Sequence, residues 1–356
     1  MMAGRGETTV RDGHAVLRRI ALLVLLLLVV QGSWLWAQAA PRENEPRLDP
    51  RQLSAQPSYI QRVEAAIVGL SVEVPPDRPS ARTLGAERFG SGVIFDAAGH
   101  VLTVSYVLLD AERIEATLRD GRKVPARLVG LDLEVGVGVV KLEGAGPWPT
   151  AALGDSTVVK PGDVVGMVGV SGDGRLSATP GRVEAVRSFS AAWEYMLDRA
   201  FVVSPHNPSF GGATLVDATG AVIGVTSLRL GDAPYMHMVI PIEQFVPGKD
   251  ELISKGRVMS RRVRPWLGLY TVSSEDGLVV SGLSPVGPAR SAGFRPGDVI
   301  VRLNGEKVGS QEEFYRRLWQ GGVGQEVQVV VQRQRGFESI TVKPADRYRI
   351  FRTIGQ

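Results

Sequence analysis

The sequence contains no cysteine, which excludes thiolate catalysis, so a serine paired with a histidine is the first candidate for nucleophilic catalysis. Histidine occurs only at positions 14, 100, 206 and 237. A serine attacks a carbonyl group when a base within about 3 Å accepts its proton. His206 and Ser209 lie on one short segment, with Asp198 upstream. This spacing allows a serine–histidine pair, but it also fits a solvent-facing histidine and a serine in a turn, which we expect here.

Metal chemistry has weaker support. His206 and His237 could ligate a metal, but no third ligand is indicated, whereas catalytic zinc sites use three protein ligands. The absence of cysteine also excludes thiolate ligands and a disulfide framework. His100 follows a glycine turn and is expected to be exposed, and Asp132 and Glu134 are expected in a solvated turn. We predict no metal and no other cofactor.

Short strands are the elements that would position these residues. Valine-rich runs recur between turns, and the chain contains 42 glycines. Asp120-Gly121 is the strongest short hairpin signal. One amphipathic helix is indicated over residues 58–66, with Ile60, Val63 and Ile67 on one face. The pattern predicts a mostly β chain that folds as a barrel or a sandwich.

A second set of signals lies near the C-terminus. Asn304-Gly305 indicates a tight turn. Ser310 is placed to cap a helix that runs through Gln320, with acidic residues in its first turn. Alternating valines at positions 327, 329 and 331 indicate a strand.

The N-terminal segment predicts export. Arg18 and Arg19 precede an apolar run over residues 20–30, and Ala37 and Ala39 fit a signal-peptide cleavage site. We interpret residues 1–39 as a signal peptide or an uncleaved signal anchor, and residues 40–57 as a linker. The predicted location is the periplasm or the outer face of the cytoplasmic membrane, with membrane contact only through this segment. The net charge is only +4 and no basic tract interleaves with aromatic residues, so nucleic-acid binding is not expected.

Several separate segments resemble HtrA-type serine proteases, in consistent order and spacing. The resemblance implies a chymotrypsin-like double β-barrel over residues 58–258. It also implies a PDZ domain, a small β-barrel with two helices, over residues 263–347. The segments that carry it are Gly90–Ile94, Gly99–Thr103, Gly130–Asp132, Asn207-Pro208, Val239–Ile242, Pro265–Leu269 and Ala292–Ile300.

Proteases of this family use a serine, a histidine and an aspartate. The resemblance places Tyr106, Gly136 and Gly211 at the histidine, aspartate and serine positions. A phenol with an ordinary pKa near 10 is a poor base at neutral pH, and glycine has no side chain. We therefore expect no catalytic residue and a pseudoprotease rather than an enzyme.

The resemblance implies that Trp266, Leu267, Gly268 and Leu269 form the carboxylate-binding loop of the PDZ domain. Backbone N–H groups of the loop would hold the C-terminal carboxylate of a peptide, and the peptide would add as a strand beside residues 269–272. Arg264 lies near this loop and is expected to be a solvated linker residue.

The expected function is peptide and protein binding by a scaffold or regulator of protein quality control in the cell envelope. Its partners would be protein C-termini or unfolded polypeptide segments, and the family implies a homotrimer or a heterotrimer with active relatives. An alternative is a serine endopeptidase with a site rebuilt around His206 and Ser209, which cleaves unfolded envelope proteins. A third hypothesis is a purely structural module tethered to the membrane.

Overall fold

The computed structural model describes residues 56–172, 174–275 and 277–351. The predicted signal segment lies outside these residues, as does almost all of the predicted linker. Within the described residues, no helix combines the length and the apolar character that a membrane span requires.

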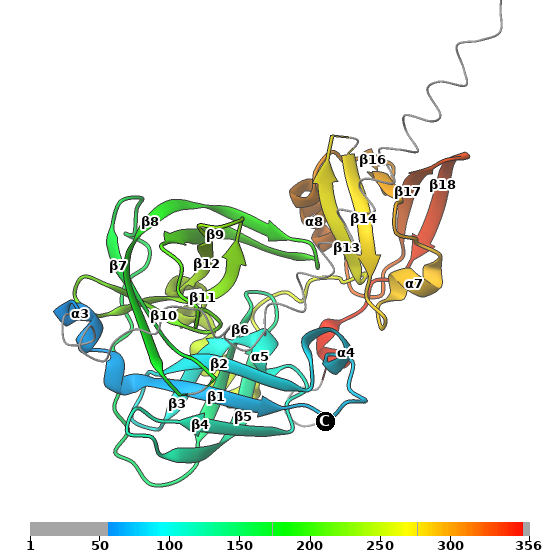
Figure 1. The fold of residues 1–356 in the computed structure, drawn as a ribbon. Coiled ribbons are helices and arrows are strands. Elements are labelled where there is room, and N and C mark those ends of the chain that lie inside the picture. The colour runs from blue at the N-terminus through cyan, green and yellow to red at the C-terminus, as the bar shows by residue number, and fades with distance from the viewer. Residues whose placement is uncertain (1–55, 173, 276, 352–356) are drawn as a thin grey trace, which may run out of the picture. The chain divides into compact units, whose positions relative to one another are not determined.

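The first part of the described chain forms a closed six-stranded barrel (Figure 1). Its order is β1-β2-β3-β6-β5-β4, with antiparallel neighbours throughout. Valine and other β-branched residues suit such a pleated, buried surface. The strands are β1 (Ile67–Glu73), β2 (Glu87–Ile94), β3 (His100–Val104), β4 (Arg113–Thr117), β5 (Lys123–Asp132) and β6 (Val137–Leu142).

The second part forms another closed barrel, of order β10-β11-β12-β9-β8-β7. Two of its strands form a long hairpin whose pairing continues to Ala191 opposite Tyr195. Residues 192–194 form the turn of this hairpin. The strands are β7 (Val164–Val170), β8 (Leu176–Ala191), β9 (Tyr195–Ser204), β10 (Thr214–Asp217), β11 (Val222–Leu230) and β12 (Met236–Pro241).

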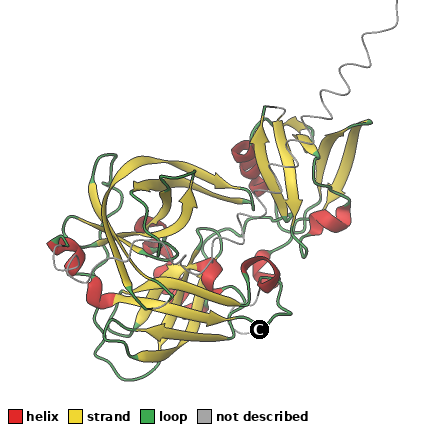
Figure 2. Cartoon of the chain, viewed as in Figure 1, coloured by secondary structure: helices red, strands yellow, loops and turns green. Residues whose placement is uncertain are grey.

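Helices are few and short beside these strands, as the red segments of Figure 2 show. The expected helix over residues 58–66 is divided into α3 and a 3₁₀ turn, η2, and Ile67 already begins β1. The helical elements of this part are α3 (Ser58–Gln61), η2 (Glu64–Ala66), α4 (Ala81–Leu84), α5 (Ser105–Leu108), η3 (Ile242–Gln244), η4 (Val246–Gly248) and α6 (Lys249–Lys255).

The C-terminal part is a six-stranded antiparallel sheet with its own apolar core. Strand β13 lies at one edge in the order β13-β14-β15-β17-β18, and β16 pairs with β15. The predicted cap is confirmed, because the Ser310 hydroxyl accepts a hydrogen bond from the N–H of Glu313 at the start of α8. The elements are β13 (Leu269–Ser274), β14 (Gly277–Leu283), α7 (Pro288–Ala292), β15 (Val299–Leu303), β16 (Glu306–Lys307), α8 (Gln311–Gln320), β17 (Val327–Arg333), β18 (Gly336–Val342) and η5 (Arg347–Arg349).

The mostly β architecture with two barrels and a third small domain confirms the predicted fold class. Strand β6 is one of the expected valine-rich runs. The Asp120-Gly121 turn joins β4 to β5. The limits of the two domains, residues 58–258 and 263–347, remain predictions.

Candidate functional site

Three residues that the sequence singled out lie where the two barrels meet. A side chain at position 211 would begin only 3.1 Å from the Tyr106 hydroxyl. The carbonyl oxygen of Gly136 accepts a hydrogen bond from the N–H of Ser105, the residue before Tyr106. Positions 106 and 211 therefore lie together, whereas a side chain at position 136 would begin 3.1 Å from the Tyr195 hydroxyl. Their assignment to the triad of the family remains a prediction.

The Tyr106 phenol is a structural hydrogen-bond donor. Its hydroxyl donates to the carbonyl oxygen of Ser227 at 2.9 Å. Burial raises the pKa of Tyr106 above its usual value, so the phenol stays protonated at neutral pH. It consequently links the two barrels and cannot accept a proton.

Two imidazoles lie in contact near this site, His206 on the loop after β9 and His237 on strand β12. The rings of His206 and His237 stack, and Nδ1 of His206 lies 3.1 Å from Nε2 of His237. This Nε2 also accepts the N–H of Asn207 at 2.9 Å, so it carries no proton in the neutral ring. Burial lowers the pKa of His237 to about 4, with a smaller contribution from His206. His237 is therefore neutral at pH 7 and a weak base.

Ser209 is the serine of this loop. It is 9% exposed, and its hydroxyl has no hydrogen-bond partner among the described residues. Its N–H donates to Oδ1 of Asn207 at 2.9 Å. The expected turn serine is therefore buried, and His206 is half-buried rather than solvent-facing. Ser209 and His206 share one loop, but the Ser209 hydroxyl makes no hydrogen bond to either imidazole in the described structure.

Glycine is required at position 212, in the same loop as Ser209. Gly212 adopts a φ of 80°, and a Cβ added there would lie 2.1 Å from the carbonyl oxygen of Ser91. Ser91 also donates its N–H to the carbonyl oxygen of Gly211 at 2.7 Å. Strand β2 thus fixes the loop against the first barrel.

Several expectations about exposure are wrong. His100 is buried, and its Nδ1 lies 2.7 Å from the Asp96 carboxylate. No group of three or more candidate metal ligands gathers within the described ranges.

Asp132 and Glu134 are buried rather than solvated. Arg261 lies 3.1 Å from the carboxylate of Asp132, and Arg347 lies 3.3 Å from that of Glu134. Arg264, expected in solvent, donates to the carbonyl oxygen of Glu134 at 3.0 Å. Burial raises the pKa of both carboxyl groups, and the nearby guanidinium groups act in the opposite direction. These residues form a buried ion-pair network whose arginines come from a distant part of the chain.

The loop over residues 266–269 binds a carboxylate. The N–H groups of Leu267 and Leu269 each donate, at 2.8 Å, to one carboxylate oxygen of Glu194. Trp266 is only 6% exposed, and its backbone N–H donates to the carbonyl oxygen of Ala345. Its side chain therefore belongs to the buried core and does not line an open groove. Sequence reasoning missed Glu194, since one glutamate in a hairpin turn carries no local signal for such a role.

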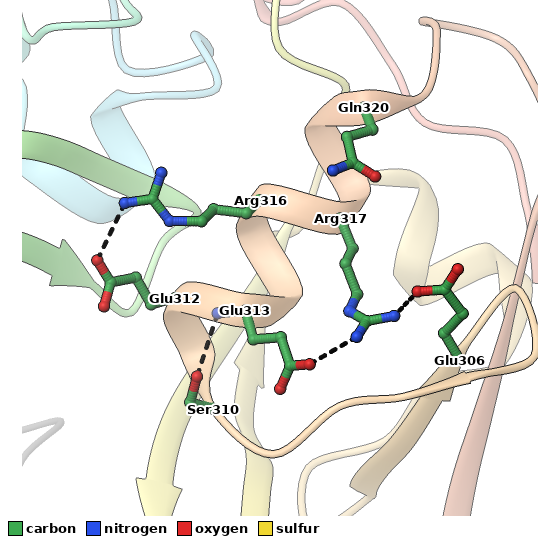
Figure 3. Close-up of a pocket in the computed structure, with 7 residues that line it drawn as sticks. All are labelled: Glu306, Ser310, Glu312, Glu313, Arg316, Arg317 and Gln320. Carbon is green, nitrogen blue, oxygen red and sulfur yellow. Dashed lines mark hydrogen bonds and ion pairs between the residues drawn. The ribbon is translucent and has the colours of Figure 1, made fainter.

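A polar depression of about 480 Å³ lies along α8 (Figure 3). Its charges pair with one another: Arg316 contacts Glu312, while Arg317 contacts Glu306 and Glu313. Such self-compensated, solvated charges do not make a ligand site. The lining residues are Glu306, Ser310, Glu312, Glu313, Arg316, Arg317 and Gln320.

Comparison with known proteins agrees with this architecture. Residues 90–225 match the trypsin-like peptidase domain family, and residues 265–343 match the PDZ domain family. The putative protease Do-like 14 of Arabidopsis thaliana is 31% identical over 305 residues, which cover 76% of this chain and 67% of that protein. This chain belongs to the HtrA family of trypsin-like serine proteases.

Other HtrA-type proteins are similar over the same region. A probable periplasmic serine endoprotease DegP-like of Halomonas elongata is 29% identical over 290 residues. The match covers 76% of this chain and 60% of that relative. The solved structure of the HtrA-type protease AlgW with decapeptide is 25% identical, with a TM-score of 0.51, and the match covers 81% of this chain and 98% of that one.

The expectation that this HtrA-type chain is not an enzyme is contradicted by its relatives. They are named as proteases, serine proteases or serine endoproteases, which points to an enzyme. Positions 106, 136 and 211 hold a phenol and two glycines, and their assignment to the catalytic triad remains a prediction.

Proposed function

We propose that this chain is an exported serine endopeptidase of the HtrA type that binds unfolded polypeptides and their C-termini through its PDZ domain. The observation that carries the binding role is the carboxylate held by the loop over residues 266–269. The endopeptidase role draws its support from the names of the relatives.

The edge of β13 offers the geometry for peptide binding. The N–H groups of Leu267, Leu269 and Thr271 recur at every second residue and donate away from β14. Alternate residues of an edge strand point their backbone groups outward, where another strand can pair with them. A polypeptide C-terminus supplies a carboxylate for the loop and carbonyl oxygens for the strand, as PDZ domains require.

Ser209 is the proposed nucleophile. Its oxygen attacks the carbonyl carbon of a peptide bond, and His206 accepts the hydroxyl proton and passes it to the departing amine. Water then hydrolyses the acyl-enzyme and releases the serine. His206 takes the part of the base because the lowered pKa of His237 makes that imidazole a weak one. The loop must move when substrate binds, since the Ser209 hydroxyl is buried and makes no hydrogen bond to His206 in the described structure.

Export to the periplasm, or to the outer face of the cytoplasmic membrane, belongs to the same proposal. The basic residues, apolar run and small residues of the first 39 positions support it. The DegP-like relatives, which are named periplasmic, support it as well.

Two measurements on the purified protein test the proposal. Peptides with free C-termini should bind, and the same peptides with amidated C-termini should bind at least about ten-fold more weakly, because the loop loses a charged acceptor. Unfolded casein should be cleaved. Binding that ignores amidation would exclude the PDZ role, and intact casein after prolonged incubation would exclude the endopeptidase role.

A further inference from the structure

The carboxylate in the PDZ loop comes from the chain itself. Glu194 belongs to the turn between β8 and β9, in the second barrel, and is 1% exposed. Its two carboxylate oxygens accept the N–H groups of Leu267 and Leu269, and the N–H of Gly268 also faces it. A side-chain carboxylate therefore occupies the position that a peptide C-terminus would take.

The same turn also uses the free edge of β13. The N–H of Thr271 donates to the carbonyl oxygen of Ala192 at 2.9 Å. The Tyr315 hydroxyl, on α8, donates to the carbonyl oxygen of Ala191 at 2.7 Å and accepts the N–H of Glu194 at 3.0 Å. All three outward N–H groups of the loop and strand are thus bound to one turn.

The turn has a conformation and an anchor that suit this contact. Glu194 adopts a φ of 58°, a left-handed conformation that is uncommon for residues other than glycine. Such strain persists where surrounding contacts hold it. Met196, two residues further along β9, is buried in the apolar core of the PDZ domain. The contact is therefore built from a carboxylate, a strand edge and a buried side chain.

We infer that the β8–β9 turn is a built-in ligand that closes the peptide-binding loop, with Glu194 in place of a terminal carboxylate. A polypeptide C-terminus must displace the turn before it binds, so the free PDZ site is available only in the undocked state. The displacement rests on the proposed peptide binding, whereas the docking of the turn does not. Occupancy by an internal ligand lowers the apparent affinity for peptides in proportion to the docked fraction.

The docked turn is expected to weaken as pH rises. Burial raises the pKa of Glu194 to about 7, and the loop N–H groups and Arg347 act in the opposite direction. Tyr270 and Tyr315 also face it, and both remain protonated near neutral pH because burial raises the pKa of each. The docked carboxyl binds its proton more tightly than an exposed one, so docking is strongest below about pH 4.5 and is lost as pH passes through 7. Peptide affinity should therefore rise between about pH 5.5 and pH 8 in the parent protein but not in Glu194→Gln. An equal rise in the variant would assign the titration to another group.

Amide hydrogen exchange of the full mature chain tests the docking without any peptide. In Glu194→Ala, exchange at Leu267, Leu269 and Thr271 should become at least about ten-fold faster, because their acceptors are released. Exchange in β17 should not change. The matched control is Asp198→Ala, which removes an exposed ion pair with Arg316 from the same hairpin but leaves the loop contacts in place. Unchanged protection of the three amides in Glu194→Ala would overturn the inference.

A fluorescent decapeptide with an apolar last residue and a free C-terminus, and its amidated form, serve as probes for the displacement. Glu194→Ala should bind the free acid at least about ten-fold more tightly than the parent protein or Asp198→Ala. Faster amide exchange with no binding by any variant would overturn the peptide-reader function and the displacement while supporting the docked turn. Equal affinity in the parent protein, Glu194→Ala and Asp198→Ala would overturn the displacement.

Discussion

Substitution of Ser209 by alanine is expected to reduce casein cleavage by at least about a thousand-fold, because the variant lacks the proposed nucleophile. The same change should leave the stability of the fold almost unaltered. The hydroxyl of Ser209 is buried without a hydrogen-bond partner in the described part of the chain. Its removal therefore breaks no hydrogen bond and removes the desolvation cost of a buried polar group. Casein turnover and urea-induced unfolding of the same preparations measure both effects.

Ser204→Ala is the matched control, since Ser204 lies just before the loop on β9 and hydrogen-bonds to Glu184. It should retain full casein turnover. Peptide binding by the PDZ domain should be the same in both variants, because neither residue contacts the loop over residues 266–269. Undiminished cleavage by the Ser209→Ala protein would exclude Ser209 as the nucleophile.

Substitution of Arg88 by methionine is expected to lower the free energy of unfolding by about 3–5 kcal/mol. The Arg88 side chain is 0% exposed, and its guanidinium donates to the carbonyl oxygens of Gly85, Tyr106 and Leu109 and to the Ser80 hydroxyl. Methionine fills a similar volume but leaves these buried acceptors without a donor. Urea-induced unfolding, followed by far-ultraviolet circular dichroism, measures the loss.

Arg113→Met is the control for that substitution. Arg113 is exposed on β4 and lies 3.8 Å from the exposed carboxylate of Glu73. Exposed ion pairs contribute little, so this variant should unfold within about 0.5 kcal/mol of the parent protein. A loss below about 1 kcal/mol in Arg88→Met would show that other donors or water replace the guanidinium. Because Arg88 holds both ends of α5, its loss should also disturb the position of Tyr106.

Local features of the fold could be predicted from the sequence. The valine run of β6, the Asp120-Gly121 turn and the Ser310 cap depend on residues within a few positions of one another. Steric and hydrogen-bonding preferences of short segments determine such features. The helix over residues 58–66 was predicted too long. Helix α3 ends at Gln61, residues 64–66 form a 3₁₀ turn, and Ile67, which was expected on the helix face, begins β1 because tertiary packing overrides a weak helical period.

The prediction about enzymatic activity failed for a different reason. It rested on the residues at positions 106, 136 and 211 and kept the pair His206 and Ser209 only as an alternative, whereas the named relatives point to an enzyme. The fold brings positions 106 and 211 together, and it buries Ser209 on the loop that carries His206. The conformation of the folded loop, and not the sequence spacing, determines which serine and which histidine approach one another.

The sequence by itself determined the mostly β architecture, since strand periodicity and turn motifs are local, and the resemblance of several segments gave the family. It also predicts a PDZ loop over residues 266–269. Only the tertiary structure decided what that loop holds. Glu194 meets Leu269 across 75 positions, and Glu134 meets Arg347 across 213. Each carboxylate is buried where a partner from a distant element satisfies it, because a charge without such a partner would remain in water. No short-range sequence pattern indicates those pairings. From the sequence alone, both glutamates are therefore expected at the surface.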